Sequence, residues 1–271
     1  GRDYLFPASQ TAYEIYVKKH GKPAQSEIIF NTPLVLYTRR NVVDAFVKEG
    51  YVSEDDGVYT MDMKKLVAAI EDGKTWADVG LPELYHTIAV GTTDPTKSNS
   101  GNMFAGLLAN TLVDGTATMK NIGDVIPRIQ DIFSRLGYME TSSADIFNQF
   151  IKTGTRPLIA GYENQILEYA LEDPDRWEKL KDDIVLMYPD PTVWSSHVYI
   201  ALDEAGRRGI DALMDPEVQR LAWEKHGFRM GVQDVSLEAD AFGVDGLVPK
   251  VTRVAPMPDA ETMDRLITAL E

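Results

Sequence analysis

Hydroxyl side chains gather in one segment of the chain, residues 89–104 (AVGTTDPTKSNSGNMF). An apolar stretch there leads into a loop rich in Ser and Thr, and apolar residues recur at helical spacing after Gly101. The segment therefore predicts a helix that starts near Ser100, with free N–H groups and the positive end of its dipole directed at the loop. A corner of this kind can bind an anion or a polar solute through neutral donors.

Catalytic motifs have no match in the sequence. The chain has no cysteine, which excludes thiolate catalysis, disulfides and zinc held by Cys. There is no G-x-S-x-G nucleophile motif, no P-loop and no dinucleotide-binding fingerprint. The histidines lack the spacing of metal ligands and are expected to be surface or structural residues; they are His20, His86, His197 and His226. We predict a protein that is not an enzyme and uses no cofactor and no metal.

The composition excludes some classes of binding partner but does not determine the cellular compartment. The chain has 271 residues, enough for a large core and for two domains or lobes. Its 27 Lys and Arg against 42 Asp and Glu give a formal charge of −15, which argues against nucleic acids and anionic membrane surfaces as partners. No apolar run is long enough to span a membrane, and no signal segment is recognised at residue 1.

Short apolar runs alternate with longer segments of helical period along the whole chain, which predicts an α/β fold with mostly parallel strands. Ser142 or Ser143 is expected to cap one of the helices. The predicted strands cover residues 5–6, 28–30, 34–37, 87–90, 157–161, 184–188 and 198–202.

Two unusual extended stretches suggest how the domains are connected. Residues 28–38 form an extended run that Pro33 interrupts, and residues 188–197 (YPDPTVWSSH) form a second one late in the chain. One early and one late crossing would let the chain leave one lobe, build a second and return. We therefore expect a two-lobed protein with a two-strand hinge.

Several motifs, taken in order, resemble those of the type 2 periplasmic solute-binding proteins, and most closely the molybdate- and oxyanion-binding branch. The likeness covers residues 3–229, and its specificity comes from the order of moderate motifs. The motifs are residues 3–10 (DYLFPASQ), 31–37 (NTPLVLY), 76–81 (WADVGL), 88–91 (IAVG), 94–104, 154–162 (GTRPLIAGY) and 213–229 (LMDPEVQRLAWEKHGFR).

The resemblance implies a two-lobed type 2 periplasmic binding protein fold with a two-strand hinge. Lobe I would comprise residues 1–33 and 197–271, and lobe II residues 34–196. The family opens with a strand, a helix and a strand before the element found here at Asp3. We therefore expect this N-terminal part of lobe I, with one ligand loop, to be missing from the chain.

By position in these motifs, the resemblance places Ser9, Ser98, Ser100, Ser143 and Tyr162 in the cleft between the lobes as ligand-binding donors. Each serine could instead cap its own helix, and Tyr162 could simply pack its ring.

Glu163 and Asn164 complicate this assignment. Asn164 is a further candidate ligand residue. Glu163 is expected on the solvent face of a helix. A carboxylate turned into the cleft would instead repel an anion and, with Asn164, favour a cation or a polar organic solute.

The function implied is an extracytoplasmic solute-binding receptor of an ABC-type importer that takes up a small oxyanion of the molybdate, tungstate or sulfate class. Such a protein would be a monomer, periplasmic or extracellular, with or without a lipid anchor, and would deliver its ligand to a membrane permease. Two alternatives stay open: a receptor for a cation or polar organic solute, and a sensing or adhesive ectodomain built on the same fold.

Overall fold

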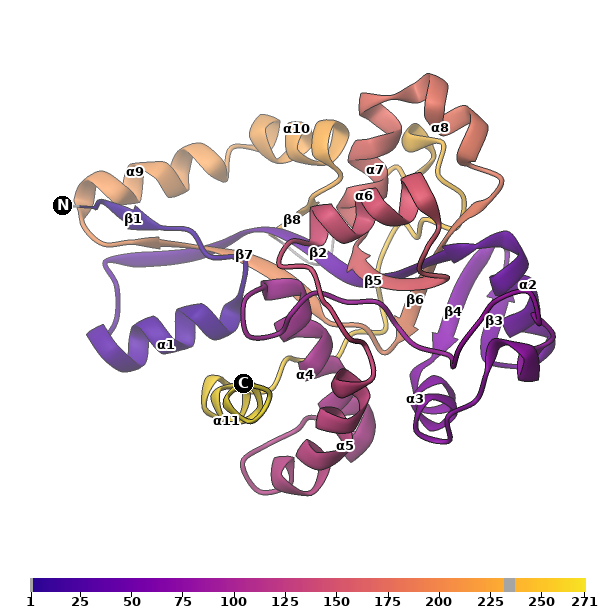
Figure 1. Ribbon diagram of the computed structural model, residues 1–271. Helices are drawn as coiled ribbons and strands as arrows, with labels where there is room; N and C mark the ends of the chain where they lie inside the picture. The colour runs from indigo at the N-terminus through magenta and orange to yellow at the C-terminus, as the bar shows by residue number, and fades with distance from the viewer. Residues whose placement is uncertain (1, 232–236) are drawn as a thin grey trace.

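The computed structural model describes residues 2–231 and 237–271. In this part of the chain the strands form one sheet in the order β1-β7-β2-β6-β4-β3, and β5 and β8 also pair with β2. The long strand β2 (Gln25–Arg39) runs through the whole sheet (Figure 1). The other strands are β1 (Tyr4–Leu5), β3 (Val52–Asp55), β4 (Val58–Asp62), β5 (Leu158–Tyr162), β6 (Ile184–Asp190), β7 (Trp194–Ala201) and β8 (Arg229–Met230).

Strand β2 belongs to two halves of the sheet. Up to Pro33 it pairs with β7 and β8, and from Leu34 onward it pairs with β5 and β6. The sequence predicted that Pro33 interrupts the extended run, yet the strand is continuous and Pro33 stands opposite Trp194. Proline has no N–H to donate, and here it occupies the register position where β2 passes from one half of the sheet to the other.

The strand directions correct the predicted, mostly parallel sheet. Strand β4 runs parallel to β6, whereas the pairings of β2 with β5, β6, β7 and β8, of β1 with β7 and of β3 with β4 are antiparallel. A central strand that is buried on both faces has the same continuous apolar sequence in either direction. Residues 31–38 of β2 are fully buried in this way, so their composition could not reveal the direction of their partners.

The strand predicted at residues 87–90 is also wrong. These residues make no regular ladder, and only isolated bridges occur nearby, from Thr87 to Thr75 and from Gly91 to Ile159. The backbone of Gly91 exchanges two hydrogen bonds of 2.8 Å with β5, from its N–H to Leu158 and from Ala160 to its carbonyl. The contact with the sheet is thus made by Gly91, just beyond the predicted strand.

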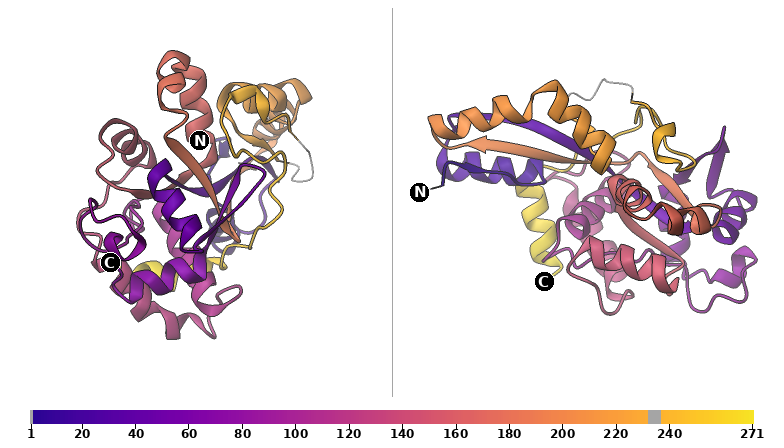
Figure 2. Two further views of the ribbon diagram at one scale, coloured as in Figure 1. Left: turned by 90° about the vertical axis from the view of Figure 1, so that its right-hand side faces the viewer. Right: turned by 90° about the horizontal axis from the view of Figure 1, so that it is seen from above.

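Helices cover the first half of the sheet on both faces, with α1 on one face and α9 and α10 on the other (Figures 1 and 2). The helices are α1 (Gln10–His20), α2 (Arg40–Lys48), α3 (Met63–Glu71), α4 (Asn99–Val113), α5 (Ile122–Ser134), α6 (Ser143–Thr153), α7 (Glu163–Glu172), α8 (Pro174–Leu180), α9 (Glu204–Leu213), α10 (Pro216–His226) and α11 (Ala260–Ala269), with short 3-10 turns at Trp76–Val79 and Asp240–Phe242. Among the described residues, no helix has both the length and the hydropathy that a membrane span requires.

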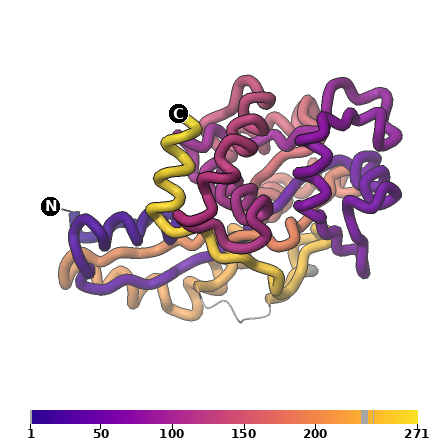
Figure 3. The backbone as a smooth tube through the Cα atoms, turned by 90° about the horizontal axis from the view of Figure 1, so that it is seen from below, coloured from indigo at the N-terminus to yellow at the C-terminus, as the bar shows by residue number. Residues whose placement is uncertain are grey.

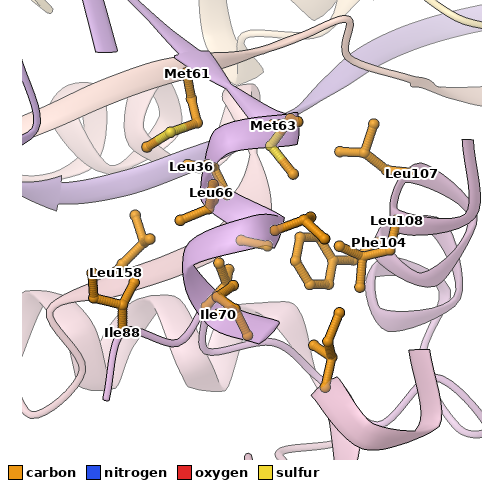
Figure 4. Packing of buried hydrophobic residues seen from close by; sticks show 14 of the residues in the cluster. Leu36, Met61, Met63, Leu66, Ile70, Ile88, Phe104, Leu107, Leu108 and Leu158 are labelled. Carbon is orange, nitrogen blue, oxygen red and sulfur yellow. The ribbon is translucent and has the colours of Figure 1, made fainter. Parts of the chain in front are cut away.

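The largest hydrophobic core lies between the second half of the sheet and helices α2 to α5. Figure 4 shows Leu36 of the sheet next to Leu66 of α3, with Leu158 on one side of that helix and Phe104 of α4 on the other. Helix α11 joins the same core and contacts α4 and α5, although it lies about 150 residues beyond them (Figure 3). The lobe boundaries drawn from the sequence placed α11 and α4 in different lobes, and those boundaries stay an interpretation.

Candidate ligand-binding site

The starts of three helices meet where the two halves of the sheet join. Helix α4 begins at Asn99, whose Nδ2 donates to the carbonyl of Ala8, just before α1, at 3.0 Å and to the Tyr162 hydroxyl, just before α7, at 2.9 Å. The Ser195 hydroxyl of β7 also donates to the Ala8 carbonyl at 2.9 Å. We call Ala8, Asn99, Tyr162 and Ser195 the junction cluster. Three positive dipole ends and neutral donors meet in it, which is an arrangement suited to an anion.

The Tyr162 phenol is a neutral donor at physiological pH. Burial raises its pKa to about 12, although side-chain hydrogen bonds with Asn99, Ser195 and Ser100 act in the opposite direction. Its own O–H points at the sulfur of Met103, 3.8 Å away. A thioether is a weak acceptor, so an oxyanion would be a stronger partner for this proton.

A chain of hydroxyls continues from the junction cluster along the start of α4. The Ser100 hydroxyl lies 2.7 Å from that of Thr93 and 3.1 Å from that of Ser98. Ser98 stands at the N-cap position, but its side chain makes no capping bond. Both predicted serines therefore bond to neighbouring hydroxyls.

Asn164 is connected to Ser195 through Thr32. The Thr32 hydroxyl donates to its side-chain oxygen at 3.2 Å and accepts from its backbone N–H at 3.3 Å. Thr32 stands directly opposite Ser195 in the β2–β7 ladder. The predicted residues Ser98, Ser100, Tyr162 and Asn164 thus lie along one polar region.

Ser9 and Ser143 lie at its margins. Ser9 holds the N-cap position of α1, beside Ala8, and makes no side-chain capping bond. Ser142 accepts a hydrogen bond from the N–H of Ala144, which confirms a serine cap for α6 and leaves Ser143 inside the helix. Ser143 is connected to the site through its carbonyl, which accepts from Gln165 at 3.0 Å.

Glu163 corrects a prediction. It was expected on the solvent face of its helix, but its side chain is completely buried. Arg229 binds its carboxylate at two points, with Nε 2.6 Å from Oε2 and Nη2 2.8 Å from Oε1. A buried carboxylate needs such a partner, and with it the charge of Glu163 is neutralised within the protein.

Sequence reasoning did not assign Asn99, Ser195 or Thr32, although each makes the contacts that connect the site. Asn99 lies between two residues that were assigned and is the first residue of α4, where an amide side chain can reach across to other elements. Ser195 and Thr32 are buried polar residues in strands, and only the register of β2 against β7 shows that they are adjacent.

A cleft of about 810 Å³ lies elsewhere along α1 and β7, and none of the four junction-cluster residues is among those that line it. Its walls include Gln10 and Thr11 at the start of α1 and Trp194 and Ser196 on either side of Ser195. The segment 250–258 closes another side. Within residues 2–231 and 237–271, no group of three or more His, Cys, Asp and Glu is arranged to hold a metal ion.

Comparisons with known proteins match at the level of structure. No family model matches the chain, and no curated protein matches its sequence. A protein of Bordetella parapertussis assigned as an extracellular solute-binding protein has a TM-score of 0.67 and 12% identity, over 99% of this chain and 79% of that one.

Two further solved structures are similar over comparable lengths. The substrate-binding protein of an ABC transporter from Agrobacterium tumefaciens has a TM-score of 0.59 and 15% identity, over 100% of this chain and 79% of that one. The apo ferric ion-binding protein A of Pasteurella haemolytica has a TM-score of 0.60 and 12% identity, over 99% and 81%. These matches confirm the predicted mixed α/β fold of periplasmic binding proteins.

Proposed function

We propose that this chain is the extracytoplasmic solute-binding receptor of an ABC-type importer and that it binds a small oxyanion at the junction cluster. The observation that carries the proposal is the meeting of three helix starts at the Tyr162 hydroxyl, which accepts from Asn99 at 2.9 Å and lies 3.8 Å from the thioether sulfur of Met103. Neutral O–H and N–H donors can replace the water of an oxyanion at fixed distances, and no counter-charge is required. The solute-binding proteins of similar fold support the receptor class.

Ligand binding would change the arrangement of the two halves of the molecule relative to each other. Residues 1–33 and 197–271 form lobe I of the proposal, and residues 34–196 form lobe II. The junction cluster takes Ala8 from lobe I and Asn99, Tyr162 and Ser195 from lobe II. A ligand that contacts both sides shifts the population toward a closed form, which a membrane permease can recognise.

A receptor for a polar organic solute is a second candidate. The cleft of about 810 Å³ lined by the start of α1, β7 and segment 250–258 offers more room than a small oxyanion needs, and Trp194 lines it. A receptor for a cation has less support, because Arg229 neutralises the carboxylate of Glu163.

Thermal unfolding against a panel of solutes tests the proposal. The panel contains molybdate, tungstate, sulfate, phosphate, ferric and divalent metal ions, and amino acids. A ligand present at 100 times its dissociation constant adds about 2.7 kcal/mol to the free energy of unfolding, so the cognate oxyanion raises the melting temperature. Stabilisation by metals or organic solutes alone would contradict oxyanion binding, and no stabilisation by any member would count against the receptor.

Tyr162→Phe tests the site itself. A hydrogen bond to a charged group contributes about 1.5–3 kcal/mol, so we expect the oxyanion affinity to fall about 10- to 100-fold in calorimetric titration. Tyr138→Phe is the matched control, since Tyr138 is 74% exposed. Equal affinities of the two variants would show that Tyr162 does not contact the ligand.

A further inference from the structure

The buried ion pair between Glu163 and Arg229 lies directly behind the proposed binding site. Glu163 is the first residue of α7, between the site residues Tyr162 and Asn164. Its side chain is 0% exposed and that of Arg229 is 6% exposed, with two hydrogen bonds of 2.6 and 2.8 Å between them. Solvent therefore screens this pair very little.

Further bonds connect the pair to two more segments. Tyr188, in β6, donates its hydroxyl proton to Glu163 at 2.5 Å and accepts from the N–H of Val248 at 3.3 Å. Arg229 donates to the carbonyls of Val248 at 2.6 Å and Pro249 at 3.1 Å. The Trp223 ring covers its guanidinium, with the carbon 5.3 Å from the ring centre. These hydrogen bonds connect four separate parts of the chain, namely the start of α7, β6, β8 and residues 248–249.

The pair also spans the place where the sheet changes from one half to the other. Arg229 pairs through β8 with Asn31, in the first half of the sheet. Glu163 directly follows β5, whose last residue, Tyr162, pairs with Leu34 in the second half. Pro33, the point of transition in β2, lies between these two register positions.

Helix α7 and helix α10 reinforce this connection outside the buried pair. The two helices are in contact, and the Cβ of Leu167 lies so near Gly227 that a side chain there would collide with it at 2.7 Å. On the surface, His226 Nδ1 lies 2.8 Å from the carboxylate of Glu168. This exposed contact between His226 and Glu168 also connects α7 and α10, so it can serve as a control for the buried pair.

We infer that the Glu163–Arg229 pair is a latch that sets the angle between the two halves of the molecule and positions the start of α7. Replacing a buried ion pair by apolar groups often leaves stability unchanged, whereas its geometry is specific. Its contribution is therefore expected in the arrangement of the halves. That the latch positions ligand residues rests on the proposed function, whereas its effect on the angle does not.

Spin-label distances test the latch without a ligand. The chain has no cysteine, so labels can be placed through Glu204→Cys in α9 and Tyr138→Cys beyond α5, at side chains 83% and 74% exposed. The double variant Glu163→Gln, Arg229→Met removes both charges and keeps the side chains close in size. We expect it to add a second distance population, while Glu168→Gln, on the exposed contact, keeps the original one.

A second variant makes the outcome of the distance measurement decisive. Arg229→Lys keeps the charge but loses the two-point contact, and it serves as the second variant if the double variant does not fold; we expect it to broaden the distribution as well. A folded variant with the original distance distribution would overturn the latch.

Affinity for the oxyanion found in the thermal panel separates the latch from the proposed function. If the binding-competent fraction falls to about a tenth, the affinity falls about tenfold. An altered distance distribution with unchanged affinity would reject the positioning of ligand residues and keep the latch. If no oxyanion binds, the proposed function fails and the distances still test the latch.

Discussion

His197 shows how a single, partly buried side chain makes stability depend on pH. It lies among aromatic rings, with Phe228 at 5.0 Å and Phe6 at 6.2 Å between ring centres. Burial lowers its pKa from 6.5 to about 4. As the pH falls, His197 therefore becomes protonated near pH 6.5 in the unfolded chain but only near pH 4 in the folded protein.

We expect this histidine to weaken the fold as the medium becomes acidic. The contribution of the neutral ring to the free energy of unfolding is complete above pH 6.5, the pKa in the unfolded chain. It falls as the pH drops toward 4, the pKa in the folded protein. Between pH 7.5 and 5 the loss is about 2 kcal/mol. Urea unfolding at both pH values measures it, and His197→Phe, which cannot be protonated, removes that part of the pH dependence. The same pH dependence in both proteins would show that the pKa of His197 does not differ between the folded and unfolded states.

At the scale of an element, the start of α4 depends on a close backbone contact. A Cβ on Gly101 would lie 2.2 Å from the carbonyl oxygen of Thr93 and 2.9 Å from the backbone of Asp94. Glycine is therefore what allows the helix to begin against the hydroxyl-rich loop. This approach brings Asn99 and Ser100 to their positions in the site.

Gly101→Ala is expected to displace the start of α4. Overpacking of this kind destabilises a protein by about 1–3 kcal/mol, and the displacement of Asn99 should also weaken ligand binding. Chemical denaturation and calorimetric titration measure the two effects. Gly115→Ala is the control, since a Cβ there has no heavy atom within 4 Å. Wild-type stability of Gly101→Ala would mean that the loop moves aside freely.

At the scale of the whole molecule, α11 connects the end of the chain to its middle. Leu266 and Met263 are fully buried in the core that contains Phe104 and Ile129. The same helix contacts α1, in the first half of the molecule. One helix therefore packs against elements on both sides of the junction.

Leu266→Ala should destabilise the whole protein. Large-to-small substitutions at fully buried leucines reduce the free energy of unfolding by about 2–5 kcal/mol. Denaturation followed by tryptophan fluorescence and by circular dichroism should shift together, because the core is shared. Leu221→Ala, at a side chain 38% exposed, is the control. An early separate transition in Leu266→Ala would show that α11 unfolds on its own.

Local patterns in the sequence determined the helix that follows the hydroxyl-rich loop, a serine cap at residue 142 or 143 and the extended crossings on either side of the junction. Helix period, capping residues and proline act over a few residues, so they are visible without the fold. The same patterns do not specify strand direction, and residues 87–90 looked like a strand because they are extended and partly apolar.

Only the tertiary structure decided which polar groups meet. Asn99, Tyr162 and Ser195 lie far apart in the chain and come together because β2 carries both halves of the sheet. Glu163 was expected in solvent, since a carboxylate is rarely buried without a partner, and its partner Arg229 is 66 residues away. The pairing of charges and the register of strands depend on long-range packing, which a sequence read in short windows does not contain.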